Sequence, residues 1–182
     1  FSDLSKSRPF KLGTQWLPWR TGEAADRDFE AWCSGNTGFP IIDAAMRQLH
    51  DTGWMHNRLR MVTAMFLTKH LLINWRRGEA YFSEKLIDLD FSSNNGGWQW
   101  SASTGCDAVP YFRIFNPVAQ GQRFDAEGKF ITRYFPDLIK LPKKQRHDPQ
   151  SQADYPAPIV DLKVGRDRAL AAFKELNNNP MT

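Results

Sequence analysis

The chain has 182 residues, of which 41% are hydrophobic, so it is long enough for one compact domain with a sizeable core and too short for two. Its formal net charge of +4 favours a partner that carries phosphate groups but is too small to identify one. Two cysteines without a CxxC pair, and no apolar run near the ~18 residues of a membrane span, argue against a disulfide framework and a membrane protein. These features predict a soluble protein in a reducing compartment, the cytoplasm.

Helical periodicity dominates the first half of the sequence. Residues 1–24 are interrupted by prolines and glycines and predict an irregular opening segment. Asp26 is expected to cap a short helix that runs to Trp32, and Pro40 is expected to open a second helix with the sequence PIIDAAMRQL. Residues 54–74 are apolar on most sides of a helix, which predicts one long central helix that is buried.

The second half of the sequence continues with helices and ends in a wrapping segment. WRRGEAYFSEKLI is amphipathic, and residues 91–104 predict a further helix although Gly96 and Gly97 together cost roughly 2 kcal/mol of helix propensity. That cost indicates a close approach to the backbone at this point. Residues 109–158 are rich in proline and predict a surface wrap with short helices such as DAEGKFITRYF, before a last helix at 159–176. No repeat and no alternating strand pattern occurs, so the predicted fold class is all-α.

Familiar catalytic motifs are absent from the sequence. It contains no HExxH, no GxSxG, no P-loop and no Rossmann fingerprint. The four histidines, His50, His56, His70 and His147, lack the spacing of metal ligands. We therefore expect no metal site and interpret His56 as a structural or surface residue.

The segment WMHNRLRM is the first candidate for chemistry. Trp54, Asn57, Arg58 and Met61 recur at helical spacing and are expected to share one face near a helix start, while Arg60 points elsewhere. An unpaired buried arginine would cost several kcal/mol, so these side chains need partners. Either an ion pair between helices or a polar floor for a planar, phosphate-bearing ligand satisfies that need, and the spacing leaves both open.

The segment LIDLDFSSNNGGWQW is the natural counterpart of the first one. Asp88 and Asp90 offer acceptors, Asn94 offers an amide, and Trp98 follows one turn later. Arg60 with Asp88 would form a buried pair. Paired carboxylates can also act as general acid and base, but no nucleophile or metal motif accompanies them. Seven tryptophans either fill a core or stack on something planar, and for any single tryptophan the core is the better expectation.

Four blocks in order, TGFPIIDAAMRQL, TGWMHNRLRM, NNGGWQWSASTG and YFRIFNP, resemble the multi-helical FAD-binding domain of the photolyase and cryptochrome family. They are most similar to bacterial class I photolyases that act on cyclobutane pyrimidine dimers. The resemblance implies that residues 1–182 are part of a C-terminal helical domain for binding FAD and DNA. Because Phe1 is not an initiator methionine, we expect a fragment whose α/β antenna domain and first helical part are missing.

The resemblance also implies an activity. In this family, excited reduced FAD donates an electron to a dimer that has been flipped out of the DNA, so the expected enzyme is a light-driven carbon–carbon lyase. The alternatives are a cryptochrome-like blue-light photoreceptor without repair activity and an inactive fragment without bound FAD. A folate or deazaflavin antenna is expected only on the missing domain. The resemblance also implies damaged DNA as the partner, no membrane association, a monomeric full-length protein and a bacterial, nucleoid-associated location. Whether (6-4) products are the substrate, and whether the short 147–155 loop is genuine, stay open.

Individual roles follow from the same resemblance. The implied FAD-binding residues are Trp54 and Asn57 on the adenine side, Arg60, Asp88 and Asp90 around the ring and ribityl edge, and Asn94 at flavin N5. The implied residues for DNA and the dimer are Asn57, Arg58, Met61, Trp100 and Arg113, with Arg58 and Arg113 on phosphates. The implied electron-transfer chain that reduces the flavin is Trp98, Trp75 and Trp19. Asn94 favours repair, because plant cryptochromes typically carry Asp there and animal ones Cys.

Overall fold

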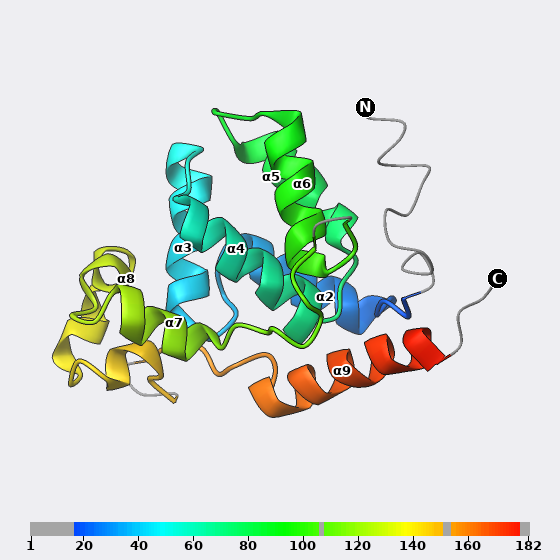
Figure 1. Ribbon diagram of the computed structural model, residues 1–182. Helices are drawn as coiled ribbons and strands as arrows, with labels where there is room; N and C mark the ends of the chain where they lie inside the picture. Colours follow the sequence, from blue (N-terminus) through cyan, green and yellow to red (C-terminus); the bar gives the residue numbers. More distant parts are fainter. Residues whose placement is uncertain (1–16, 106–107, 151–153, 179–182) are drawn as a thin grey trace.

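The computed structural model describes residues 17–105, 108–150 and 154–178, and these ranges contain helices and no strand (Figure 1). The predicted all-α class is confirmed. The elements are α2 (Glu23–Ser34), α3 (Pro40–Thr52), α4 (Asn57–Met65), the π-helix η2 (Phe66–His70), α5 (Trp75–Lys85), α6 (Phe91–Ala102), α7 (Pro117–Phe124), α8 (Lys129–Tyr134), the 3₁₀-helices η3 (Pro136–Lys140) and η4 (Gln145–His147), and α9 (Leu162–Asn178). None of the helices in these ranges has the length and apolar surface that a membrane crossing requires.

The start of α2 differs from the prediction, whereas α3 begins where expected. Gly22 is the N-cap of α2 and makes no side-chain bond, and Asp26 lies in the first turn. The Asp26 carboxylate instead accepts a hydrogen bond of 2.7 Å from Arg77 of α5. α3 begins at Pro40, because proline has no N–H and loses nothing in the first turn of a helix.

The single helix predicted for residues 54–74 is wrong. The segment contains α4, the π-helix η2 and a link that is not helical. His56 caps α4, because its Nδ1 accepts the backbone N–H two residues later at 3.1 Å. The link contains Leu72 in a left-handed conformation (φ 51°). The Asn74 side chain caps α5, because its oxygen accepts a hydrogen bond of 3.0 Å from a backbone N–H in the first turn. These caps satisfy N–H groups that have no partner at a helix start, so the chain stops and restarts despite its continuous apolar pattern.

The later helices agree better with the sequence. α6 begins at the predicted Phe91 and ends within two residues of the predicted end. α9 begins three residues after the predicted position, because Asp161 Oδ1 accepts the backbone N–H of Val164 at 2.9 Å and caps the helix. The tip of the 147–155 loop lies outside the described residues.

An aromatic cluster forms the centre of the core. The Trp32 ring of α2 is fully buried and lies 5.9 Å from the Phe82 ring of α5 and 6.0 Å from the Trp98 ring of α6, measured between centroids. Phe82 and Trp98 contact each other edge to face at 5.1 Å. Trp98 reaches this position because Gly78 of α5 presents no side chain to it. Three helices are therefore tied together by rings at the point where α5 and α6 pack.

A buried carboxylate holds the turn between α2 and α3. Both oxygens of Asp43 in α3 accept hydrogen bonds, at 2.7 Å from Thr37 N, 2.6 Å from Thr37 Oγ1, 3.1 Å from Gly38 N and 2.6 Å from Tyr155 Oη. Burial raises the pKa of Asp43 above its ordinary value, and these four bonds oppose the rise. The contact with Tyr155 joins the end of the wrapping segment to the α2–α3 turn.

The π-helix η2 joins the core to the last helix. All five of its residues are buried, and α9 packs against it. Gly165 of α9 allows this contact, because a Cβ there would lie 2.6 Å from the carbonyl oxygen of His70. The same oxygen accepts a hydrogen bond of 2.6 Å from Arg168. α9 lies along the edge of the other helices in Figure 1 as a result of this contact.

The packing of Trp98 on Gly78 yields the first prediction. In Gly78→Ala, the added Cβ would overlap the Trp98 ring and lie 2.7 Å from Leu67 Cδ2. Alanine gains about 1 kcal/mol of helix propensity over glycine, but overpacking costs ~1–3 kcal/mol, so we expect net destabilisation of up to roughly 2 kcal/mol in urea unfolding. Gly96→Ala is the matched control, because nothing lies within 4 Å of its Cβ position, and it should stabilise the fold. Equal effects of both substitutions would contradict the proposed packing constraint.

Candidate functional site

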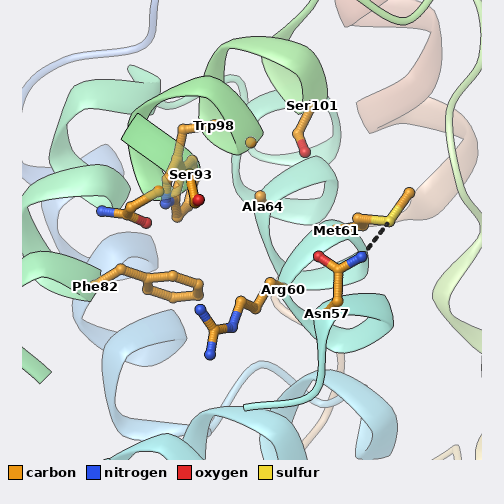
Figure 2. A pocket seen from close by; sticks show the side chains of 10 residues that line it. Asn57, Arg60, Met61, Ala64, Phe82, Ser93, Trp98 and Ser101 are labelled. Atoms are coloured by element: carbon orange, nitrogen blue, oxygen red, sulfur yellow. Dashed lines mark hydrogen bonds between the residues drawn. The ribbon is translucent and has the colours of Figure 1, made fainter. Parts of the chain in front are cut away.

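A pocket lies between α4 and α6, with α5 closing one side (Figure 2). Its cavity volume is about 100 Å³, and all the empty space of the pocket, including the part open to solvent, is about 440 Å³. The lining residues are Asn57, Arg60, Met61 and Ala64 from α4, Phe82 from α5, and Ser93, Asn94, Gly97, Trp98 and Ser101 from α6. The two segments singled out in the sequence therefore face each other as opposing walls.

The face of α4 that lines the pocket differs from the predicted one. Arg60 was expected to point away from Asn57 and Met61, but the three side chains line the pocket together (Figure 2). The helix begins only at Asn57, so Trp54 precedes it and lies outside the helical face. Arg58 is rotated by about 100° from its neighbour and also leaves the pocket wall.

Arg60 and Asp88 form the predicted ion pair. Arg60 Nη2 donates to both Asp88 oxygens, at 3.0 and 2.8 Å, and Arg60 Nε donates to the carbonyl of Met55 at 2.7 Å. The expectation of burial is wrong, since the side chains are 26% and 43% exposed. A pair that is this exposed contributes about 0–1 kcal/mol to stability. Its main effect is to orient the guanidinium on the pocket side of α4.

Asn94 presents a hydrogen-bond acceptor to the pocket. Its side chain is buried, and Nδ2 donates to the carbonyl of Glu79 at 3.2 Å and to Ser83 Oγ at 3.0 Å. A carbonyl oxygen only accepts, so the NH₂ group must face α5 and the amide cannot be reversed. In the described part of the chain no group donates to Asn94 Oδ1, which leaves this oxygen to accept an N–H from a ligand.

Asp90 has a structural partner. Its Oδ1 accepts the backbone N–H of Ser93 at 2.7 Å and so caps α6, and hydrogen bonds from Ser93 lower the pKa of Asp90. Asp90 is exposed and does not line the pocket. The cap fixes the start of the helix that carries Asn94.

Two glycines leave the α6 wall open. An added Cβ would meet nothing within 4 Å at Gly96 or Gly97, and Gly97 lines the pocket. The predicted close approach to the backbone is therefore possible at Gly97. A flat, heteroaromatic ligand such as FAD fits this combination of a bare backbone, the aromatic rings of Phe82 and Trp98, the Arg60 guanidinium and the free Asn94 oxygen. The cavity volume is smaller than the ~300–1,000 Å³ of ligand pockets, so these walls would hold one face of FAD and not all of it.

The predicted DNA-facing residues divide into two groups. Asn57 and Met61 line the pocket and contact each other, with Asn57 Nδ2 and Met61 Sδ 4.0 Å apart (Figure 2). Arg58, Trp100 and Arg113 lie outside it; Trp100 is half-buried and Arg113 is exposed.

The three tryptophans of the predicted electron-transfer chain become more exposed in the predicted order. Trp98 is 2% exposed, Trp75 is 7% exposed, and Trp19 is only partly buried. The rings packed on Trp98 are those of Phe82 and Trp32, and the sequence analysis assigned neither of them a role. Ala64, Phe82, Ser93 and Ser101 were not predicted to line the site, because apolar and small residues carry little chemical signal. The described ranges contain no cluster of metal-ligating side chains.

Comparison with known proteins agrees with this geometry. Residues 2–175 match the family described as FAD binding domain of DNA photolyase. The deoxyribodipyrimidine photo-lyases of Escherichia coli (strain K12) and Vibrio cholerae are 54% and 53% identical over 178 residues, which is 94% of this chain and 37% of each relative. The chain thus spans a little over a third of these relatives.

Solved structures are similar as well. A class III photolyase from Agrobacterium tumefaciens has a TM-score of 0.90 and 43% identity, covering 98% of this chain and 39% of the other. An archaeal photolyase from Sulfolobus tokodaii, solved with two FAD molecules, has a TM-score of 0.85 and 39% identity, covering 94% of this chain and 39% of the other. A cryptochrome from Synechocystis has a TM-score of 0.78 and 37% identity, covering 86% of this chain and 34% of the other.

The open backbone at Gly97 yields the second prediction. In the full-length protein, Gly97→Ala should weaken FAD binding by roughly 5-fold to 150-fold, because a methyl group would occupy the ligand side of the wall and overpacking costs ~1–3 kcal/mol. Gly96→Ala is the matched control, because Gly96 has the same open surroundings but does not line the pocket, so FAD affinity should be unchanged. Titration of the protein with FAD, followed by flavin absorbance, measures both. Normal FAD affinity in Gly97→Ala would place the ligand elsewhere.

Proposed function

The chain belongs to the family of FAD binding domains of DNA photolyases, and from this premise we propose that the protein that carries it repairs cyclobutane pyrimidine dimers in DNA with light. FAD is the cofactor of this family. The pocket between α4 and α6 is the proposed site for the flavin ring. The observation that carries the proposal is the fixed Asn94 amide, whose oxygen receives no donor in the described part of the chain and whose neighbours in the α6 wall include Gly97 and Trp98.

The side chains of the pocket position the cofactor in this proposal. Reduced FAD, when bound, supplies the light-excited electron that splits the cyclobutane ring and receives it back afterwards. Asn94 Oδ1 accepts an N–H from the ring system, and its fixed orientation selects one edge of the ring. Arg60 faces the ring or ribityl edge while Asp88 balances its charge. Trp54, which precedes α4, and Asn57, which begins it, are proposed to lie on the adenine side.

A second set of residues receives the damaged DNA. Repair requires the dimer to leave the base stack, which costs least where the damage already disturbs stacking. We assign Met61 and Trp100 to the cavity that receives the dimer, with Asn57 at its edge, and Arg58 and Arg113 to backbone phosphates. The charge of +4 supports contacts with phosphate.

A third set reduces the flavin when it is oxidised. We assign this role to Trp98, Trp75 and Trp19, and the increase in exposure along that order supports a path from the pocket toward solvent. Indole rings suit the role because they can be oxidised.

The alternative is a blue-light photoreceptor with the same fold. The similarity to the Synechocystis cryptochrome supports it. Asn94 and the matches to photolyases favour repair. We also propose that the chain is part of the helical domain of a longer protein, and that the antenna domain and the first helical part lie outside it.

The proposal is tested with the full-length protein, reduced FAD and an oligonucleotide that contains one cyclobutane dimer. Blue light should restore the two pyrimidines, while the dark control and an oligonucleotide with a (6-4) product should stay unchanged. An unchanged dimer in the illuminated sample, with FAD bound, would refute repair. Equal affinity for damaged and undamaged DNA would then favour the photoreceptor.

Trp100→Ala separates the dimer cavity from the flavin site. Stacking of a base on an aromatic ring is worth roughly 1–3 kcal/mol, so affinity for dimer-containing DNA should fall by about 5-fold to 150-fold. Affinity for undamaged DNA and the FAD content should stay the same, as measured by fluorescence anisotropy and flavin absorbance. Loss of FAD together with dimer affinity would show that Trp100 belongs to the flavin site instead.

A further inference from the structure

The segment 108–116 lies between α6 and α7 in the chain and forms neither helix nor strand (Figure 1). Because its backbone has no regular structure of its own, its position depends on contacts from other elements. The Tyr111 ring stacks on the Phe173 ring of α9, with the centroids 5.4 Å apart. Farther along the segment, the carbonyl of Phe115 accepts a hydrogen bond of 2.9 Å from His70 Nε2 of the π-helix η2. These contacts attach the segment both to α9 and to η2.

His70 makes its contact from inside the core. The residue is 2% exposed, and its ring lies 5.7 Å from the Phe66 ring, measured between centroids. A carbonyl oxygen only accepts, so Nε2 carries the hydrogen and the neutral ring has its lone pair on Nδ1. In the described ranges of the chain, Nδ1 has no hydrogen-bond partner. The ring therefore donates one hydrogen bond, and a second proton would enter a buried position where no acceptor is in place.

Positively charged side chains lie near the ring. The charges that affect it most belong to Arg168 and Arg166 of α9. Arg168 also donates a hydrogen bond of 2.6 Å to the carbonyl of His70. Lys69, the preceding residue of η2, directs its ammonium group to the Ser103 hydroxyl at 2.8 Å. A protonated ring would therefore add a positive charge to a region that already contains cations.

No carboxylate pairs with the ring within the described residues, since Nε2 bonds to a backbone carbonyl and Nδ1 has no partner. Asp28, whose charge acts on Arg168, pairs with Arg20 at 2.7 Å. Asp161, which precedes α9, accepts the backbone N–H of Val164 at 2.9 Å. The helices α4, α5 and α6 also pack on η2, and their described residues supply no such partner either. A charge on the ring would thus be buried without a counterion, which is unfavourable.

The surroundings favour the neutral form of the ring. Burial lowers the pKa of His70 below its ordinary value of 6.5, and the charges of Arg168 and Arg166 lower it further, while the nearby backbones of Phe115 and Leu162 oppose the change. The unfolded chain binds the proton more readily than the folded one. The contribution of the neutral ring to stability is therefore complete above about pH 6.5, and it is lost progressively as the pH falls below that value.

We propose that His70 is a pH-sensitive positioning residue for the segment 108–116. The neutral ring holds the segment against η2 in the arrangement that binds DNA, and protonation releases it. A buried cation without a counterion is unfavourable, so the protonated ring reaches solvent by opening the Phe115 contact. The stack with α9 contains no group that titrates near neutral pH, so it holds its end of the segment in acid as well. The inference rests on the proposed function, because Arg113 of this segment is assigned to DNA.

Amide hydrogen exchange tests the release in the full-length protein with bound FAD. After correction for the intrinsic pH dependence of exchange, residues 108–116 should exchange about tenfold faster at about pH 5.5 than at about pH 8, because each pH unit below the ordinary pKa of the released histidine favours opening by about a factor of ten. His70→Gln keeps an N–H donor and cannot be protonated, so its corrected exchange should be the same at both pH values. A tenfold rise in both proteins, or in neither, would overturn the inference.

Two further variants separate the hydrogen bond from other effects of a substitution. His50→Gln is the matched control, because it removes an exposed histidine that lies 3.4 Å from Asp51, and it should keep the wild-type response of the segment. His70→Leu removes the donor, so the segment should exchange roughly 2-fold to 12-fold faster than in His70→Gln at about pH 8, the fold-change that corresponds to one hydrogen bond. Exchange in α2 reports on the whole domain in the same samples. An equal acceleration of α2 in His70→Leu would show general destabilisation and overturn the positioning role.

DNA binding distinguishes a failure of this inference from a failure of the proposed function. In fluorescence anisotropy with a duplex that contains one cyclobutane dimer, wild type and His70→Gln should bind equally at about pH 8, and wild type should bind up to about tenfold more weakly than the variant at about pH 5.5. FAD affinity should be the same in both proteins. If exchange follows the prediction but DNA affinity does not, the release by protonation is supported and the proposed function loses the DNA contact of this segment. If exchange does not follow the prediction, the inference fails whatever the DNA affinities are.

Discussion

The seating of Trp98 against Gly78 is the constraint on which the rest of the site depends. It lets α5 and α6 approach more closely than any residue with a side chain at position 78 would allow. The distance between these helices sets where Asn94 meets the carbonyl of Glu79, and it also brings Phe82 into the pocket beside Trp98. The Trp98 ring thus belongs both to the core and to the wall of the pocket.

Backbone carbonyls orient the two most polar side chains of the pocket. The carbonyl of Met55 accepts from Arg60, and the carbonyl of Glu79 accepts from Asn94. A backbone carbonyl cannot change rotamer, so these groups are held in place before a ligand arrives. Preorganised donors and acceptors need no rearrangement when charge moves on a cofactor. This favours a rigid ligand site over a loosely fitting cleft.

The sequence predicted the fold class, the start of α3, the extent of α6 and the fact that the two polar segments face each other. Helical periodicity, the position of proline and recognisable blocks of residues carry this information directly. It did not predict the break after η2, since the apolar pattern continues through Leu72 while local caps at His56 and Asn74 decide the helix ends. The exposure of the Arg60–Asp88 pair was also missed. The pairing of Arg60 with Asp88 could be predicted from their opposite charges. How deeply the pair is buried depends on how the α5–α6 loop packs.

The π-helix η2 sets the rotational phase between the pocket and the last helix. A π-turn contains one residue more than an α-turn, so it changes the direction of every following side chain by roughly 100°. Deleting one residue there would restore a regular α-helix but turn His70, whose carbonyl receives Arg168, away from α9. We therefore expect the number of residues in η2 to vary less than the identity of those residues. Chains that differ by one residue here would have to find a different docking mode for their last helix.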